Sequence, residues 1–229
     1  KEYRRQRQMC IRDSTMTRPV PPRLVPAEYI QTSVTGNKVS RRAVIYGAAN
    51  IVLGGKCVIH HNAVLRGDLK RVVHARSGDE GGAASPSVVI VMGRYGLLQD
   101  GCILRPPYKT LQGCVLRRSA PLTSSQFSFF PLRIGDHVCI GRGSVVEAAQ
   151  IGSHVEVGAN CVIGRMAILR DCCVVLDGAV VAPNTVVPSM CVFGGSPARL
   201  VGHLPESFRE TSEQESRAYY YGFSERAPA

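Results

Sequence analysis

The amino-acid sequence predicts an all-β protein, a single-stranded left-handed parallel β-helix made of hexapeptide repeats, with a helix at its C-terminus. An apolar residue recurs at every sixth position over a long stretch, and this period fits neither an α-helix nor a single strand. The residue four positions after each apolar one is mostly small. The 23 glycines and the absence of tryptophan also favour tight, repetitive β-structure.

The repeat is most regular in the second half of the chain. Three hexads are expected to form one triangular coil, and successive coils to stack as parallel strands about 4.8 Å apart. Sets with the same spacing also begin upstream at Leu53, Met92 and Ile134, and one shortened step of five residues joins Val146 to Ile151. The positions predicted to fill the inside of the coils are Ile151, Val157, Ile163, Leu169, Val175, Val181, Val187 and Phe193.

The cysteines follow the same repeat. The chain has nine cysteines and no CxxC pair. We therefore expect those at the small-residue position to be buried hydrophobic side chains, and neither zinc ligands nor a disulfide framework. These are Cys57, Cys102, Cys161, Cys173 and Cys191.

The repeat also sets the domain boundaries. We expect the β-helix to span residues 36–203, after an extended proline-rich arm at 16–35. A C-terminal helix and tail should occupy 204–229, because Pro205 suits the first turn of a helix over 206–221.

Two segments inside the β-helix break its rhythm. Residues 70–87 are polar and rich in glycine, serine and alanine, and residues 109–130 are mixed in composition. We expect both to be loop insertions, which solenoid proteins tolerate between coils.

The first 15 residues are interpreted as a non-native segment. The letters MCIRDS within them are a translation of ATG TGT ATA AGA GAC AG, a string that resembles a sequencing-library adaptor. The native protein would then begin at Met16, and the net charge of +11 would fall to +8. The alternative is a disordered basic arm.

Composition argues against several functional classes. No apolar run approaches the roughly 18 residues of a membrane helix, and the N-terminus lacks the apolar core of a signal peptide. The basic residues are scattered and are not interleaved with aromatic residues, so we expect no nucleic-acid binding. A cytosolic protein is the default expectation.

Short motifs raise the question of an enzyme. Arg66-Gly67-Asp68 and Gln99-Asp100 resemble motifs of the γ-class carbonic anhydrases, as does the shortened step that ends at Ile151. In those zinc enzymes, histidines at three further positions bind the metal.

The residues at those three positions argue against zinc. Alignment on the motifs places Arg105, Arg142 and Glu147 there, and we call these three residues the ligand positions. Zinc requires neutral imidazole or anionic ligands, whereas an arginine remains protonated and has no lone pair to donate. We therefore predict no metal, no cofactor and no catalytic residues, and expect Arg66 and Asp68 to form an ion pair, at a coil corner or between subunits.

A second enzyme class with this fold is the hexapeptide acyltransferases, which use a histidine as general base. His74 lies in the 70–87 insertion, where such a base could lie. His137 and His154 follow a coil corner and are expected to face solvent. Acyl transfer stays an alternative, less favoured than a scaffold.

Long segments resemble the dynactin subunit 5 family, one of two kinds of hexapeptide-repeat subunit at the pointed end of dynactin. These segments lie at 28–69 (with NKVSR), at 103–109 (ILRPPYK), at 129–140 (FFPLRIGDHVCI) and at 148–188 (with DCC). The departures from the family are the two insertions and the C-terminal tail.

The resemblance implies a non-enzymatic role. Such a subunit would form a heterodimer with dynactin subunit 6. It would also contact the pointed-end actin-related protein and the zinc-binding scaffold subunit, dynactin subunit 4. The assembly would recruit cargo adaptors for cytoplasmic dynein, in the cytoplasm on microtubules and at the centrosome.

Overall fold

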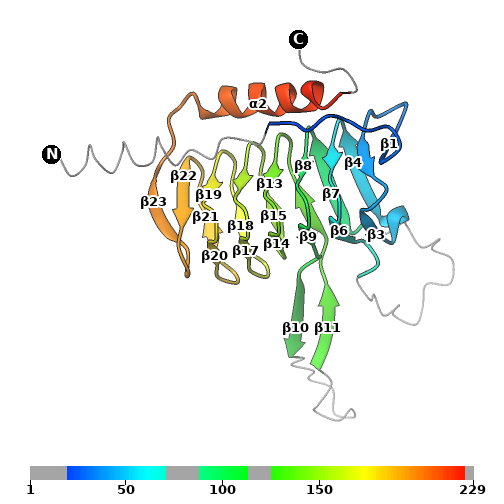
Figure 1. The fold of residues 1–229 in the computed structure, drawn as a ribbon. Helices are drawn as coiled ribbons and strands as arrows, with labels where there is room; N and C mark the ends of the chain where they lie inside the picture. The colour runs from blue at the N-terminus through cyan, green and yellow to red at the C-terminus, as the bar shows by residue number, and fades with distance from the viewer. Residues whose placement is uncertain (1–19, 71–87, 113–124, 225–229) are drawn as a thin grey trace.

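The chain forms a three-sided solenoid that is covered on one side by a helix (Figure 1). The computed structural model describes residues 20–70, 88–112 and 125–224. Its short strands stack into three sheets, and within each sheet consecutive coils pair in parallel. The all-β fold class predicted from the period of six is confirmed.

Each sheet contains one side of every coil. We call them sheets A, B and C. Sheet A contains β1 (Tyr29–Gln31), β2 (Lys38–Ser40), β5 (Val58–Ile59), β8 (Leu97–Leu98), β13 (Cys139–Ile140), β16 (Glu156–Val157), β19 (Val174–Val175), β22 (Cys191–Gly194) and β23 (Arg199–His203). Sheet B contains β3 (Val44–Tyr46), β6 (Val64–Arg66), β9 (Ile103–Leu104), β14 (Val145–Val146), β17 (Val162–Ile163) and β20 (Val180–Val181). Sheet C contains β4 (Ile51–Gly55), β7 (Ile90–Arg94), β12 (Leu132–Ile134), β15 (Gln150–Ile151), β18 (Ile168–Leu169) and β21 (Val186–Val187). A short 3-10 helix, η1 (Ala48–Asn50), joins β3 to β4.

The inside of the solenoid is one continuous apolar core. The seven inward positions from Ile151 to Val187 are all buried, and the five cysteines at the small-residue position lie in the same core or at its edge. The shortened step does not break the ladder, since Ile134 pairs with Ile151 and Ile151 with Leu169.

The backbone conformation at the coil corners explains why asparagine and glycine recur in the repeat. The residue before each small position has a positive φ, as at Asn62 (56°), Asn160 (54°) and Asn184 (59°). Asparagine and glycine tolerate this left-handed conformation better than other residues. Gly143 (66°) and Gly178 (66°) occupy equivalent corners.

Antiparallel strands close both ends of sheet A. β1 pairs with β2 at the N-terminal end, and β23 pairs with β22 at the other. The expected arm at 16–35 thus contains a strand, and its residues before position 20 lie outside the described part, as does the segment 1–15. Pairing of this kind protects a sheet edge that would otherwise expose backbone hydrogen-bonding groups.

The C-terminal helix α2 (Phe208–Gly222) lies across the strands of sheet A (Figure 1). It forms a second apolar core with the outer side of that sheet. Tyr219, Tyr220 and Phe223 pack there against Val58 and Leu97.

The second insertion is not a simple loop. Its described ends are β10 (Tyr108–Gln112) and β11 (Ser125–Phe129), which pair as an antiparallel ribbon that projects from the solenoid (Figure 1). The rings of Tyr108 and Phe129 face each other across the ribbon, 6.1 Å between centroids, and such cross-strand aromatic pairs stabilise a hairpin. Residues 71–87 and 113–124 of the two insertions lie outside the described part.

The variant Ile163→Asp tests which residues of the repeat point into the core. This side chain is fully buried, so an unpaired carboxylate there should abolish the cooperative unfolding transition seen by circular dichroism. The matched control is Val162→Asp on the same strand, whose side chain is 42% exposed and points outward. We expect that variant to stay within about 1 kcal/mol of the parent protein. Equal melting temperatures for the two variants would contradict the assigned repeat phase.

Candidate functional site

Two of the three ligand positions meet on sheet B. Arg105 follows β9 and Glu147 follows β14, and the two strands pair so that Leu104 lies beside Val146. The side chains form an ion pair, with 3.1 Å between a guanidinium nitrogen of Arg105 and Oε1 of Glu147. The carboxylate, the sole anionic group of the three, is thus already held by a cation.

The third ligand position, Arg142, is exposed at the turn after β13. The set of residues does not fit a zinc ion, because two of its three members are cations without a free lone pair. Within residues 20–70, 88–112 and 125–224, no group of three or more His, Cys, Asp or Glu residues is placed to bind a metal.

Arg66 and Asp68 form a bidentate ion pair at the corner after β6. Nε and a terminal nitrogen of Arg66 donate to the two carboxylate oxygens of Asp68, each at 2.8 Å. These hydrogen bonds lower the pKa of Asp68. The guanidinium also lies over the ring of Tyr46, 5.1 Å from its centroid. The pair therefore lies within one chain, which is one of the two arrangements expected from the sequence.

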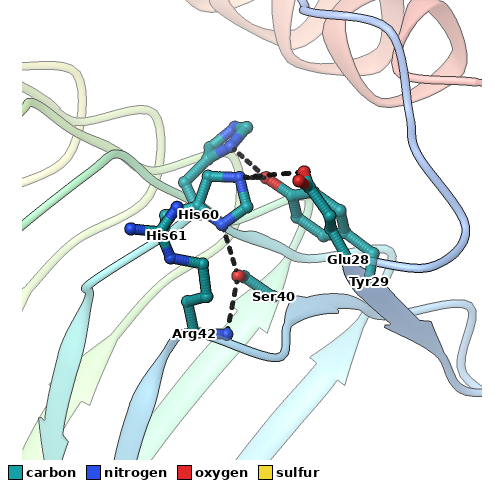
Figure 2. Close-up of polar contacts among 6 residues, drawn as sticks. All are labelled: Glu28, Tyr29, Ser40, Arg42, His60 and His61. Atoms are coloured by element: carbon teal, nitrogen blue, oxygen red, sulfur yellow. Dashed lines mark hydrogen bonds and ion pairs between the residues drawn. The ribbon is translucent and has the colours of Figure 1, made fainter.

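A second polar cluster lies at the N-terminal end of sheet A, close to helix α2 (Figure 2). The Ser40 hydroxyl is 2.7 Å from Nδ1 of His61, and Nε2 of His61 is 3.5 Å from a carboxylate oxygen of Glu28. The Tyr29 hydroxyl contacts Nδ1 of His60 at 2.9 Å, and Nε2 of His60 contacts the Tyr219 hydroxyl at 2.7 Å.

The serine, histidine and glutamate of this cluster are the residue types of a hydrolase triad, but the serine is buried. Ser40 is 3% exposed, and its oxygen already accepts the amide hydrogen of Arg42. A nucleophile must reach its substrate, and this hydroxyl is covered. The hydrogen bonds of the cluster instead hold β1, β2 and the first coil together.

The buried members of the cluster are neutral at pH 7. Burial lowers the pKa of His60 to about 4 and raises the pKa of Tyr29 to about 12. A neutral imidazole has one donor and one acceptor nitrogen, which matches its two tyrosine partners. One oxygen of Asp100, from the Gln99-Asp100 motif, is buried nearby without a hydrogen-bond partner among the described residues.

The prediction that His137 and His154 face solvent is wrong. Both are buried beneath α2, with their rings stacked 5.0 Å apart, and His137 also stacks on Tyr95 at 5.0 Å. Nδ1 of His137 is 2.5 Å from the Ser216 hydroxyl of the helix. Because the apolar periodicity of the helix is weak, the sequence did not indicate that the helix would cover sheet A and bury these histidines. His74 lies outside the described residues.

Sequence reasoning also missed Lys38, a buried lysine at the end of α2. Its Nζ donates to the backbone oxygens of Tyr220 (3.0 Å) and Phe223 (2.5 Å), and lies 4.1 Å from the centre of the Tyr220 ring. A cation is favourable at the C-terminus of a helix, where carbonyl groups lack partners. The available signal was a lysine in the NKVSR segment, at an outward position of sheet A.

Comparison with known proteins identifies the family. The family model Dynactin subunit 5 matches residues 83–227, more than half of the chain. The chain belongs to the dynactin subunit 5 family. The protein of that name from Dictyostelium discoideum is 32% identical over 127 residues, which cover 56% of this chain and 48% of the relative. The chain thus spans about half the length of that relative.

The chain is also similar to proteins whose names describe enzymes or enzyme families. A probable carbonic anhydrase of Methanocaldococcus jannaschii is 25% identical over 182 residues, covering 80% of this chain and 89% of that protein. A hexapeptide transferase family protein from Anaplasma phagocytophilum has a TM-score of 0.50 at 16% identity, covering 84% of this chain and 94% of that one. The structural likeness shows the fold alone. In the described part of this family member, no helix is long and apolar enough to span a membrane.

The pKa of His60 predicts acid sensitivity in this family member. Its folded pKa of about 4 lies below the ordinary value of 6.5, so between these pH values the unfolded chain binds more protons. The contribution of His60 should therefore lower the free energy of unfolding by about 3 kcal/mol as the pH drops from 6.5 to 4. Urea unfolding at pH 7.5 and 4.5 measures the change.

His60→Gln should weaken this pH dependence, although it also costs stability at pH 7.5 through lost hydrogen bonds. His203→Gln, at an exposed histidine, is the control for replacing a histidine and should keep the stability at pH 7.5 within about 1 kcal/mol of the parent. A parent protein equally stable at both pH values would contradict the buried neutral imidazole.

Removing the lysine that caps the helix should loosen α2. We expect Lys38→Met to destabilise the protein by about 2–3 kcal/mol, because the two backbone carbonyls lose a charged donor. Amide hydrogen exchange in residues 208–222 should accelerate. Lys70→Met, at an exposed lysine, is the control and should change neither quantity.

Proposed function

We propose that this chain is a non-catalytic subunit of the dynactin pointed-end complex. Its membership of the dynactin subunit 5 family supports this role, as does the ion pair between Arg105 and Glu147 at the ligand positions. The ion pair is the observation that carries the non-catalytic part of the proposal, because it leaves no ligand set for the metal that a hydratase needs.

The proposed partners follow from this role. The chain would form a heterodimer with dynactin subunit 6 and contact the pointed-end actin-related protein and dynactin subunit 4. Together they would recruit cargo adaptors and so support cytoplasmic dynein on microtubules and at the centrosome. A rigid solenoid suits such a role, since its flat faces need no rearrangement to bind.

A tagged copy purified from cells under native conditions tests the proposal. Mass spectrometry should find the other dynactin subunits in amounts comparable to the bait. The control is a copy with Ile163→Asp, which lacks the folded solenoid and should recover none of them. Purification as a homotrimer free of dynactin subunits would contradict the proposed role.

A metal assay tests the non-catalytic part directly. The purified chain should contain far less than one zinc ion per molecule, since two of the three ligand positions are arginines. It should also show no carbon dioxide hydration above buffer. About one zinc per chain together with hydratase activity would overturn the proposal, whereas zinc alone at a surface site would not.

A further inference from the structure

A row of side chains follows the corner between sheets C and A, on the side of the solenoid that α2 covers. Each coil contributes one residue at a position with positive φ, and four consecutive members are Tyr95, His137, His154 and Cys172. Their backbone amides bond to the preceding coil, as the amide of His154 does to the carbonyl oxygen of Asp136 at 2.8 Å. The backbone of the row is therefore fixed by the coil stack.

Two imidazoles of this row are stacked face to face. The ring centroids of His137 and His154 are 5.0 Å apart with 4° between the ring planes, and the residues are 8% and 7% exposed. We call these two residues the histidine pair. Burial lowers the pKa of both, and for His137 the neighbouring imidazole lowers the pKa further. Both rings are therefore neutral at pH 7 while the helix covers them.

The helix meets the histidine pair through polar groups. Nδ1 of His137 is 2.5 Å from the Ser216 hydroxyl, which itself donates to the backbone oxygen of Glu213 at 2.9 Å. A hydroxyl has one hydrogen, so Ser216 accepts from Nδ1, and the proton of the neutral ring is on that nitrogen. Nδ1 of His154 is buried and has no hydrogen-bond partner among the described residues. This contact is thus built for neutral rings, and only partly satisfied.

The two halves of α2 are held unequally. In the first half, residues 208–216, the buried side chains are Ser212 and Ser216. In the second half Tyr219 and Tyr220 are buried, and backbone carbonyls at the helix end accept hydrogen bonds from Lys38. Buried apolar area supplies most of the free energy that holds a helix on a sheet, so the first half is the part that separates at lower cost.

Charged and titratable groups surround the histidine pair. Those of α2 are Arg209, Glu213 and Arg217, those at the coil corners are Tyr95, Asp136, Asp171 and Cys172, and Glu156 is buried on the outer side of β16. The carboxylates at 136, 171 and 213 raise the pKa of the pair, and the two arginines lower it. Burial is the largest effect, so the pKa of both histidines lies below the ordinary value of 6.5.

We propose that the histidine pair is an acid-sensitive switch that controls the docking of the first half of α2 on the solenoid. A proton taken up beneath the docked helix creates a buried cation against a second ring, whereas undocking exposes both rings to water. Below pH 6.5 the undocked state therefore binds more protons, and falling pH favours it. The second half stays in place through Lys38 and the tyrosines. The inference is independent of the proposed function.

Amide hydrogen exchange of the full chain at pH 7.5 and 5.5, corrected for the intrinsic effect of pH, tests the switch. We expect the protection of residues 212–216 to fall at least about tenfold at pH 5.5 and to become lower than that of residues 219–223. The double variant His137→Gln/His154→Gln should show no such pH dependence, because glutamine does not titrate. His60→Gln, which removes a histidine beneath the other half of the helix, is the matched control and should keep it.

Unchanged protection of residues 212–216 in the parent protein would overturn the inference, whatever the variants show. An equal loss of protection in the strands of the solenoid would also overturn it, since that result means global unfolding. If melting curves show that the double variant is unfolded, an NMR titration of the parent takes its place. Helix amides that change with the same midpoint as the two imidazoles would support the switch, and imidazoles that titrate without a change in the helix would contradict it.

Discussion

The structure depends on the register between successive coils. No coil buries its inner side chains alone, so each must place its apolar residue directly beside that of the next, as Ile151 lies beside Leu169. Corner aspartates reinforce the stacking, since Asp136, Asp171 and Asp177 each accept an amide hydrogen of a neighbouring coil, at 2.6–2.7 Å. A ladder fixed in this way gives the protein three rigid faces.

The three faces share one interior but differ in what covers them. Sheet A binds α2, which is held at its C-terminal end by buried Lys38 and along its length by the hydrogen bonds of His60 and His137. Sheet C carries the polar residues Arg133 and Gln150 in its outward row, whereas the outward row of sheet B, from Val44 to Val180, is apolar. Functional differences between proteins with this fold therefore depend on the outward residues, because the period of six constrains only the inward ones.

The inward positions and the corners could be predicted from the sequence, because both repeat along the chain. The long-range contacts could not, since no local pattern links His60 to Tyr219, or Lys38 to the end of the helix. His137 illustrates the limit. Its corner position was evident from the repeat, but its burial depends on a helix that begins 71 residues later, at Phe208. At the ligand positions, the residue types were evident from the sequence, whereas the pairing of Arg105 with Glu147 required the fold.

That pairing also sets the charge at the edge of sheet B. An arginine alone at the edge of sheet B would need a counter-ion from any partner that covered it, and supplying one would restrict which partners fit. Because Glu147 already pairs with Arg105 within the chain, neither charge needs a counter-ion from outside. Arg105, which cannot ligate zinc, thus holds the carboxylate that could, and the two charges balance each other.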